Sequence, residues 1–119
     1  MWEVDLLLDT ILKNLAESKA NDILNIDLRG KSEQLDNMVI ASGTSNRHVS
    51  SIAEKLISIV KRNLGVRVRT EGMSNSDWVL IDCGDVVVHV FHNDLRSTYS
   101  LEDLWSDAKD LTYELSIDE

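Results

Sequence analysis

The chain has a single cysteine, Cys83, and no proline among its 119 residues. One thiol excludes an internal disulfide framework and any metal site built from several cysteines. No apolar run approaches the roughly 18 to 20 residues that a membrane span needs. Residues 1–15 hold acids among their leucines and lack a basic leader, so they do not resemble a secretory signal. These absences predict a reduced, cytoplasmic protein with no membrane partner.

Basic residues are scarce as well. There are 12 Lys and Arg against 21 Asp and Glu, for a formal net charge of −9, and residues 102–119 alone hold 7 acids against 1 base. Binding to nucleic acid depends on Lys and Arg clustered against phosphates, and no such cluster is found along the chain. The charge therefore disfavours direct, sequence-specific binding of RNA or DNA. It favours a basic protein partner, and ribosomal proteins are one such class.

Helical periodicity is clear in two segments. Apolar residues recur at intervals of three and four positions in residues 4–15 and 49–64, which predicts two amphipathic helices. Thr44 or Ser45 can cap the second helix by accepting a backbone N–H, and Gly65 suits its C-terminal end.

Five segments have the composition of strands. They are residues 23–29, 36–42, 66–70, 77–81 and 86–91. Residues 82–85 form a tight turn with Gly at the third position, so the last two strands should make a hairpin. A loop from Asn93 to Ser100 then leads to a last amphipathic helix over 101–115, and residues 106–119 form an acidic helix end and tail. The order of elements predicts the α/β class, with one domain over residues 1–119 and a mixed sheet of about five strands flanked by helices.

Residues 43–48 (GTSNRH) lie where a strand meets a helix, and backbone N–H groups there can attract an anion. The segment lacks the lysine and the glycine spacing of a phosphate loop, and it does not match the dinucleotide fingerprint. Two interpretations stay open. One is a helix cap with a turn glycine, and the other is a contact with a protein or a phosphate through Arg47 or His48.

The candidates for chemistry are few. His89 and His92 should point to different faces of a strand, and no second ligand pair is near, so no metal site is predicted. His89 is either a structural side chain or a binding contact. Ser45, His89 and Asp82 could be written as a triad, but they lie in no recognisable nucleophile motif. We expect no catalytic residue, no cofactor and no turnover.

Aromatic residues number only 6. Trp105 lies on the apolar stripe of the last predicted helix and should be in the core. Trp78 begins a strand, and Tyr99 follows Arg96 in the predicted loop. Trp, Tyr and Arg anchor many protein interfaces because they bury a large area for few lost rotamers. Together with acidic neighbours they suggest a binding face.

Three motifs in order resemble one family. They are DNMVIASGTSNRHVSSIAEKL, EGMSNSDWVLIDCGDVVVHVF and RSTYSLEDLW, and they resemble the ribosomal silencing factors (the Iojap-related proteins). The resemblance implies a protein that binds the large ribosomal subunit through its protein fourteen, blocks joining of the small subunit and so represses translation. It also implies a nucleotidyltransferase-like fold. The enzyme chemistry is not implied, because no Asp-x-Asp motif follows the turn at residues 43–45.

The resemblance further implies a partner-binding face. Its residues would be Glu71, Trp78, Asp82, His89, Arg96 and Tyr99. Trp78 would be the buried anchor with His89 and Tyr99 beside it, while Glu71 and Asp82 would meet basic side chains. Cys83 departs from the family pattern, in a turn where it should not alter binding. A monomer or a homodimer fits this function. The alternatives are an assembly factor for the large subunit and, less well supported, a small nucleotide-processing enzyme.

Overall fold

Five strands form one mixed sheet with the spatial order β1-β2-β5-β4-β3. The computed structural model describes residues 2–30 and 35–98, so the predicted helix at 101–115, with Trp105, and Tyr99 lie outside the described residues. The elements are α1 (Trp2–Glu17), β1 (Asn21–Asp27), β2 (Asn37–Gly43), α2 (Asn46–Leu64), β3 (Arg69–Glu71), β4 (Trp78–Asp82), β5 (Val86–His92) and α3 (Asn93–Thr98). The predicted α/β class and the five-stranded mixed sheet are confirmed.

The central pair of strands is parallel. β2 pairs with β5 in parallel, while β1–β2, β4–β5 and β3–β4 are antiparallel. The predicted hairpin between β4 and β5 is confirmed, and the Cys83 N–H donates to the carbonyl of Val86 across its turn at 3.0 Å. Both central strands are apolar and buried along most of their length, as expected for strands covered on both faces.

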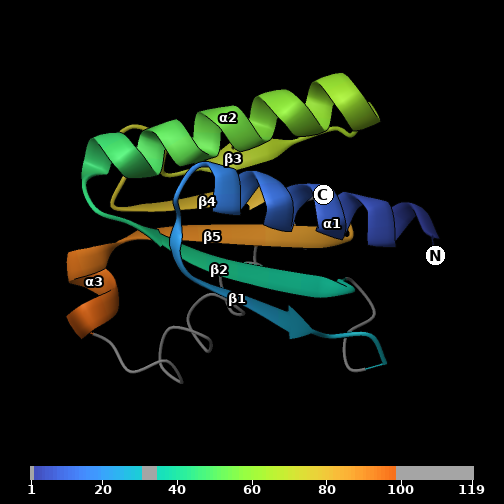
Figure 1. Ribbon diagram of the computed structural model, residues 1–119, viewed down its shortest axis with the longest axis horizontal. Helices are drawn as coiled ribbons and strands as arrows, with labels where there is room; N and C mark the ends of the chain where they lie inside the picture. The colour runs from blue at the N-terminus through green and yellow to red at the C-terminus, as the bar shows by residue number, and fades with distance from the viewer. Residues whose placement is uncertain (1, 31–34, 99–119) are drawn as a thin grey trace.

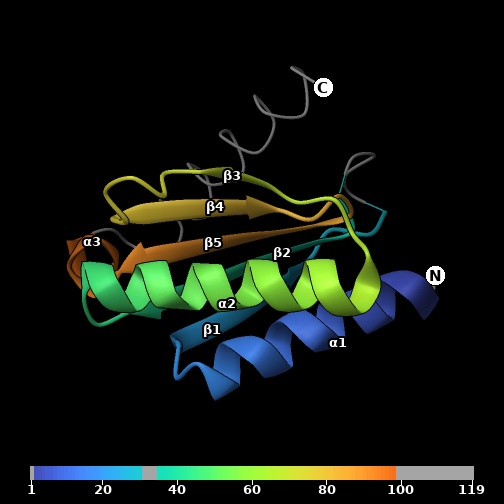
Figure 2. The same ribbon diagram turned by 90° about the horizontal axis from the view of Figure 1, so that it is seen from above.

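Helices α1 and α2 lie side by side on one face of the sheet (Figures 1 and 2). Strand side chains that alternate beneath them, such as Val39, Ile81 and Val88, form the main hydrophobic core together with helix residues such as Leu56. The other face of the sheet is apolar too. Its buried apolar side chains include Met38, Ile40, Leu80, Val87 and Phe91.

Helix α2 begins and ends where the sequence predicts. The Ser45 hydroxyl accepts the His48 N–H at 3.0 Å, which satisfies one free donor of the first turn. Gly65 adopts φ 62°, and its N–H donates to the carbonyl of Lys61. The apolar stripe from Val49 to Val60 is buried against the sheet.

Helix α1 ends in a Schellman motif without the glycine that this motif favours. The Ala20 N–H donates to the Leu15 carbonyl and the Lys19 N–H to the Ala16 carbonyl, both at 3.0 Å. Lys19 itself has φ 61°, a left-handed conformation that costs a side-chain-bearing residue free energy.

We therefore expect Lys19→Gly to raise the free energy of unfolding by about 1 kcal/mol, because glycine adopts this φ without a steric penalty. Urea titration at neutral pH measures the change. Lys13→Gly, in the exposed middle of the same helix, is the matched control and should lower stability by about 1 kcal/mol instead. A Lys19→Gly protein less stable than the parent would contradict the assignment.

The predicted bounds of β1, β2 and β4 differ from the structure by one or two residues, and two other segments differ more. β3 covers Arg69–Glu71 rather than residues 66–70, because Val66 and Val68 pack against the core without pairing to β4. Residues Asn93–Thr98 form the short helix α3 rather than a loop, and the Asp94 N–H at its start donates to the His92 ring at 3.0 Å.

Candidate functional site

Four of the six residues that the resemblance singles out share one face of the sheet. In the β4–β5 pair Trp78 lies opposite Phe91 and Leu80 opposite His89, and paired residues point to the same side. Glu71 of β3 lies opposite Leu80, so it follows the same row. This face is the one turned away from α1 and α2 (Figure 2). Arg96 belongs to α3, and its side chain, like all of Tyr99, is outside the described residues.

Trp78 is half-buried at the start of β4, near the edge of the sheet. Its indole N–H donates to Nδ1 of His89 at 2.9 Å. The indole also packs on the ring of Phe91, with the ring centroids 4.8 Å apart. One edge of the indole is thus fixed by a hydrogen bond and one face by an aromatic contact. A side chain held in this way has little rotamer freedom left to lose on binding.

His89 is fully buried behind Trp78, with 0% of its surface exposed. Burial lowers the pKa of His89 to about 3, because the apolar surroundings disfavour the charged ring. The ring is therefore neutral at pH 7 and accepts at Nδ1. This buried position fits the structural interpretation of His89, because the ring positions the indole of Trp78. Its expected contact with a partner stays a prediction.

Asp82 ends β4 and is also buried, with 8% exposed. One carboxylate oxygen accepts the Gly84 N–H at 2.9 Å, which shapes the β4–β5 turn. Arg69 lies directly opposite Asp82 in the neighbouring strand. The expected contact of Asp82 with a basic partner does not suit this buried position. Glu71, in contrast, is exposed and free to face a partner from the edge strand.

Gly72 lies against the backbone of Trp78, and sequence reasoning missed it. Its φ is 84°, and an added Cβ would overlap the carbonyl oxygen of Trp78. The Gly72 carbonyl accepts the Ser76 N–H at 3.1 Å, so the turn between β3 and β4 is closed tightly. A glycine just after an edge strand could have indicated this close approach of two backbone segments.

The other end of this turn is attached to α2 and β5. The Asn46 amide donates to the Asp77 carboxylate at 2.6 Å and to the Asn75 carbonyl at 2.8 Å. The His92 N–H donates to the Asp77 carbonyl at 2.8 Å. Trp78 therefore follows a residue held from two sides, which is a geometry suited to an anchor.

The turn at residues 43–48 is occupied by internal contacts. Nδ1 of His48 accepts the Thr44 N–H at 2.9 Å, and its Nε2 lies 3.0 Å from the carbonyl of Ser18. The second nitrogen must then carry the proton, so His48 ties the start of α2 to the end of α1. Only Arg47, which is exposed, is left for an external contact.

The groups that could be written as a triad do not form one. The Ser45 hydroxyl caps α2, and Nδ1 of His89 is engaged by Trp78. Burial, and then Asp82, raise the pKa of the Cys83 thiol to about 12, so the reactive thiolate is disfavoured. Within residues 2–30 and 35–98, no group of three His, Cys, Asp or Glu could hold a metal ion.

A family model described as "Ribosomal silencing factor during starvation" matches residues 3–119. The chain belongs to this ribosomal silencing factor family. A ribosomal silencing factor of Bacillus subtilis is 45% identical over 93 residues, which are 77% of this chain and 78% of that one. A second, from Zymomonas mobilis, is 40% identical over 104 residues, covering 87% and 78%.

Solved structures agree with the fold of the silencing factor. A crystal structure from Bacillus halodurans has a TM-score of 0.76 at 38% identity and covers 85% of this chain and 94% of that chain. One from Chromobacterium violaceum has a TM-score of 0.77 at 33% identity, covering 86% and 85%. The family is named for a regulatory role rather than for catalysis. Among the described residues, no helix combines the length and the apolar content needed to cross a membrane.

Proposed function

We propose that this ribosomal silencing factor represses translation by binding the large ribosomal subunit at its protein fourteen and blocking access of the small subunit. The proposal is supported by the family membership and by one observation in particular. That observation is the half-buried indole of Trp78, fixed by His89 and Phe91 at the edge of an apolar sheet face. Steric occlusion of this kind needs a rigid docking surface and no catalytic group.

Acidic side chains flank the anchor. Glu71 and Asp77 are both exposed, one at the end of β3 and one just before β4. A basic ribosomal protein would be attracted to this edge, and the attraction would weaken as salt is added. Shape and apolar area at Trp78 would supply most of the affinity, since rim charges contribute mainly to the rate of association.

Replacing Trp78 with Ala should weaken binding to the large subunit by at least ~2 kcal/mol, the scale of interface hot spots. The measurement is co-sedimentation with purified subunits on a density gradient, together with the fraction of joined ribosomes. Leu6→Ala is the matched control, because Leu6 is an exposed large apolar residue on α1, with 45% exposed. It should bind like the parent. A folded Trp78→Ala protein that co-sediments as tightly as the parent would sink the anchor assignment.

A second function is favoured by one relative. A mouse protein named "Mitochondrial assembly of ribosomal large subunit protein 1" is 34% identical over 103 residues, although these cover only 45% of its length. The same docking face could serve assembly of the large subunit. Depletion of the protein separates the two functions, because an assembly factor leaves immature large subunits behind, whereas a repressor leaves mature subunits that join too readily.

A further inference from the structure

Sequence reasoning identified no phosphate-binding cluster of Lys and Arg, but half of the basic residues lie in one region of the chain that the docking face does not use. Residues 44–70 contain 6 of the 12 Lys and Arg and only 1 of the 21 acids. They are Arg47, Lys55, Lys61, Arg62, Arg67 and Arg69. Most of this region is α2, which packs on the sheet face opposite Trp78. In a protein of net charge −9, half of the bases thus lie on α2 or in the segment that follows it.

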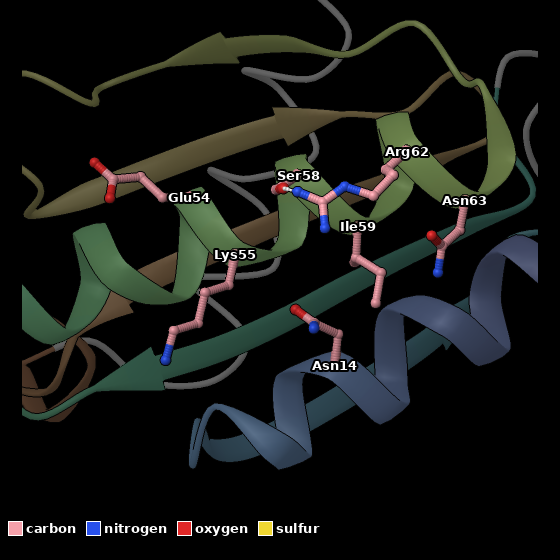
Figure 3. Close-up of a pocket in the computed structure, with 7 residues that line it drawn as sticks. All are labelled: Asn14, Glu54, Lys55, Ser58, Ile59, Arg62 and Asn63. Carbon is pink, nitrogen blue, oxygen red and sulfur yellow. Dashed lines mark hydrogen bonds between the residues drawn. The ribbon is translucent and has the colours of Figure 1, made fainter.

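A groove lies between α2 and α1 (Figure 3). It has a volume of about 410 Å³ and is lined by Asn14 from α1 together with Lys55, Ser58, Ile59, Arg62 and Asn63 from α2, with Glu54 at its margin. Lys55 and Arg62 are two helical turns apart, about 10 Å along the helix. The guanidinium of Arg62 donates to the Ser58 hydroxyl at 3.2 Å, which holds it along α2.

Asn14 contributes an unused acceptor to the groove. Its side chain is 9% exposed, and its Oδ1 has no hydrogen-bond donor among the residues that the structure describes. Figure 3 shows the amide pointing from α1 toward α2. A buried carbonyl without a donor costs free energy, so a ligand that supplies an O–H or N–H here is favoured.

The cations of the groove are also available. Within the described ranges, neither Lys55 nor Arg62 forms an ion pair with a carboxylate. The groove therefore offers two positive charges, against the one carboxylate of Glu54, and one hydrogen-bond acceptor to the same ligand. A ribose-phosphate chain carries the complementary groups, since its phosphates are anionic and its 2′-hydroxyl is a donor.

We propose that the groove between α1 and α2 binds a single-stranded RNA backbone, with phosphates at Lys55 and Arg62 and a ribose hydroxyl at Asn14. The choice of RNA over an acidic protein rests on the ribosome docking proposed above, because ribosomal proteins are mostly basic and RNA is the polyanion beside them. The overall negative charge makes this binding weak and strongly dependent on salt. The contact would orient the protein on the subunit while Trp78 anchors it.

The test is fluorescence anisotropy of a labelled single-stranded RNA with the full chain at low salt. The double variant Lys55→Gln, Arg62→Gln should lose about tenfold in affinity, and the slope of log affinity against log salt should fall by about 1.4 for the two lost phosphate contacts. Lys61→Gln is the matched control on the same helix but outside the groove, and it should stay within about twofold of the parent. If the Lys61→Gln control loses as much RNA affinity as the double variant, the groove assignment is overturned.

Asn14→Leu separates a binding role from a structural one. It removes the buried acceptor, so the melting temperature should rise, while RNA affinity should fall about threefold because the hydroxyl contact is lost. A rise in melting temperature with unchanged RNA affinity would remove Asn14 from the site.

The competitors identify the ligand. DNA of the same sequence, which lacks the 2′-hydroxyl, should compete less well than RNA. If polyglutamate displaces the RNA as effectively as unlabelled RNA does, the partner is an acidic protein and the proposal fails. If ATP binds this groove more tightly than RNA, the source of the ribose-phosphate is a free nucleotide and the RNA assignment fails. Trp78→Ala should keep full RNA affinity, so failure of the docking proposal and failure of this inference give different results.

Discussion

Gly72→Ala should both unfold the protein more easily and abolish docking to the large subunit. The methyl group would overlap the carbonyl oxygen of Trp78, and the φ of 84° would be strained for any residue with a Cβ. Left-handed strain and steric overlap together should lower the free energy of unfolding by about 3 kcal/mol. Relief of the overlap requires the start of β4 to move, and the indole moves with it.

Gly65→Ala is the matched control for Gly72→Ala. Gly65 has φ 62°, yet a Cβ at this position would meet nothing within 4 Å. It therefore carries the backbone strain without the overlap and should cost about 1 kcal/mol, with docking unchanged. Urea unfolding and co-sedimentation with large subunits measure the two effects. Equal losses of stability in the two variants would show that the contact with Trp78 contributes nothing.

The elements with strong periodicity could be predicted from the sequence, and the weak ones could not. α2 has an apolar stripe, a Ser45 cap and a Gly65 end, so all three signals agree on its bounds. β3 has only three residues, and its register depends on the turn at Gly72, which local composition does not reveal. α3 is short and polar, so it has no apolar stripe that would distinguish it from a loop.

The placement of Trp78 and His89 on one face of the sheet could be predicted from the sequence, but the role of each side chain could not. Trp78 and His89 fall on the same face because each strand alternates and the hairpin fixes their register. Which of these two side chains is exposed depends on packing from both sides of the sheet. The alternation of side chains along a strand does not predict this packing. The Asn14 Oδ1, which has no donor in the part of the chain that the structure describes, could not be predicted either, because an asparagine on the inner side of an amphipathic helix has no signature in the sequence.

Acidification should destabilise the protein through His89. The pKa of the buried ring is lowered from 6.5 to about 3, so below pH 6.5 the unfolded chain binds a proton that the folded chain refuses. The contribution of His89 to stability is thus complete above pH 6.5 and is lost as the pH falls toward 3. One pKa unit corresponds to about 1.4 kcal/mol, so the loss from pH 7 to pH 5 should be about 2 kcal/mol.

His89→Gln isolates this effect, since its amide oxygen can still accept the indole N–H of Trp78 but does not titrate between pH 5 and 7. His48, His92 and every carboxylate remain in the variant. Urea titration at pH 7 and pH 5 measures how much stability each protein loses. The difference between the two losses is then due to His89. The parent should lose about 2 kcal/mol more than the variant. Because the ring in the folded protein stays neutral down to about pH 3, it keeps holding the indole, and docking of the folded parent should not change through His89 between pH 7 and pH 5. Equal pH dependence in the two proteins would mean that the ring is protonated in the folded state, and Trp78 would then need another acceptor.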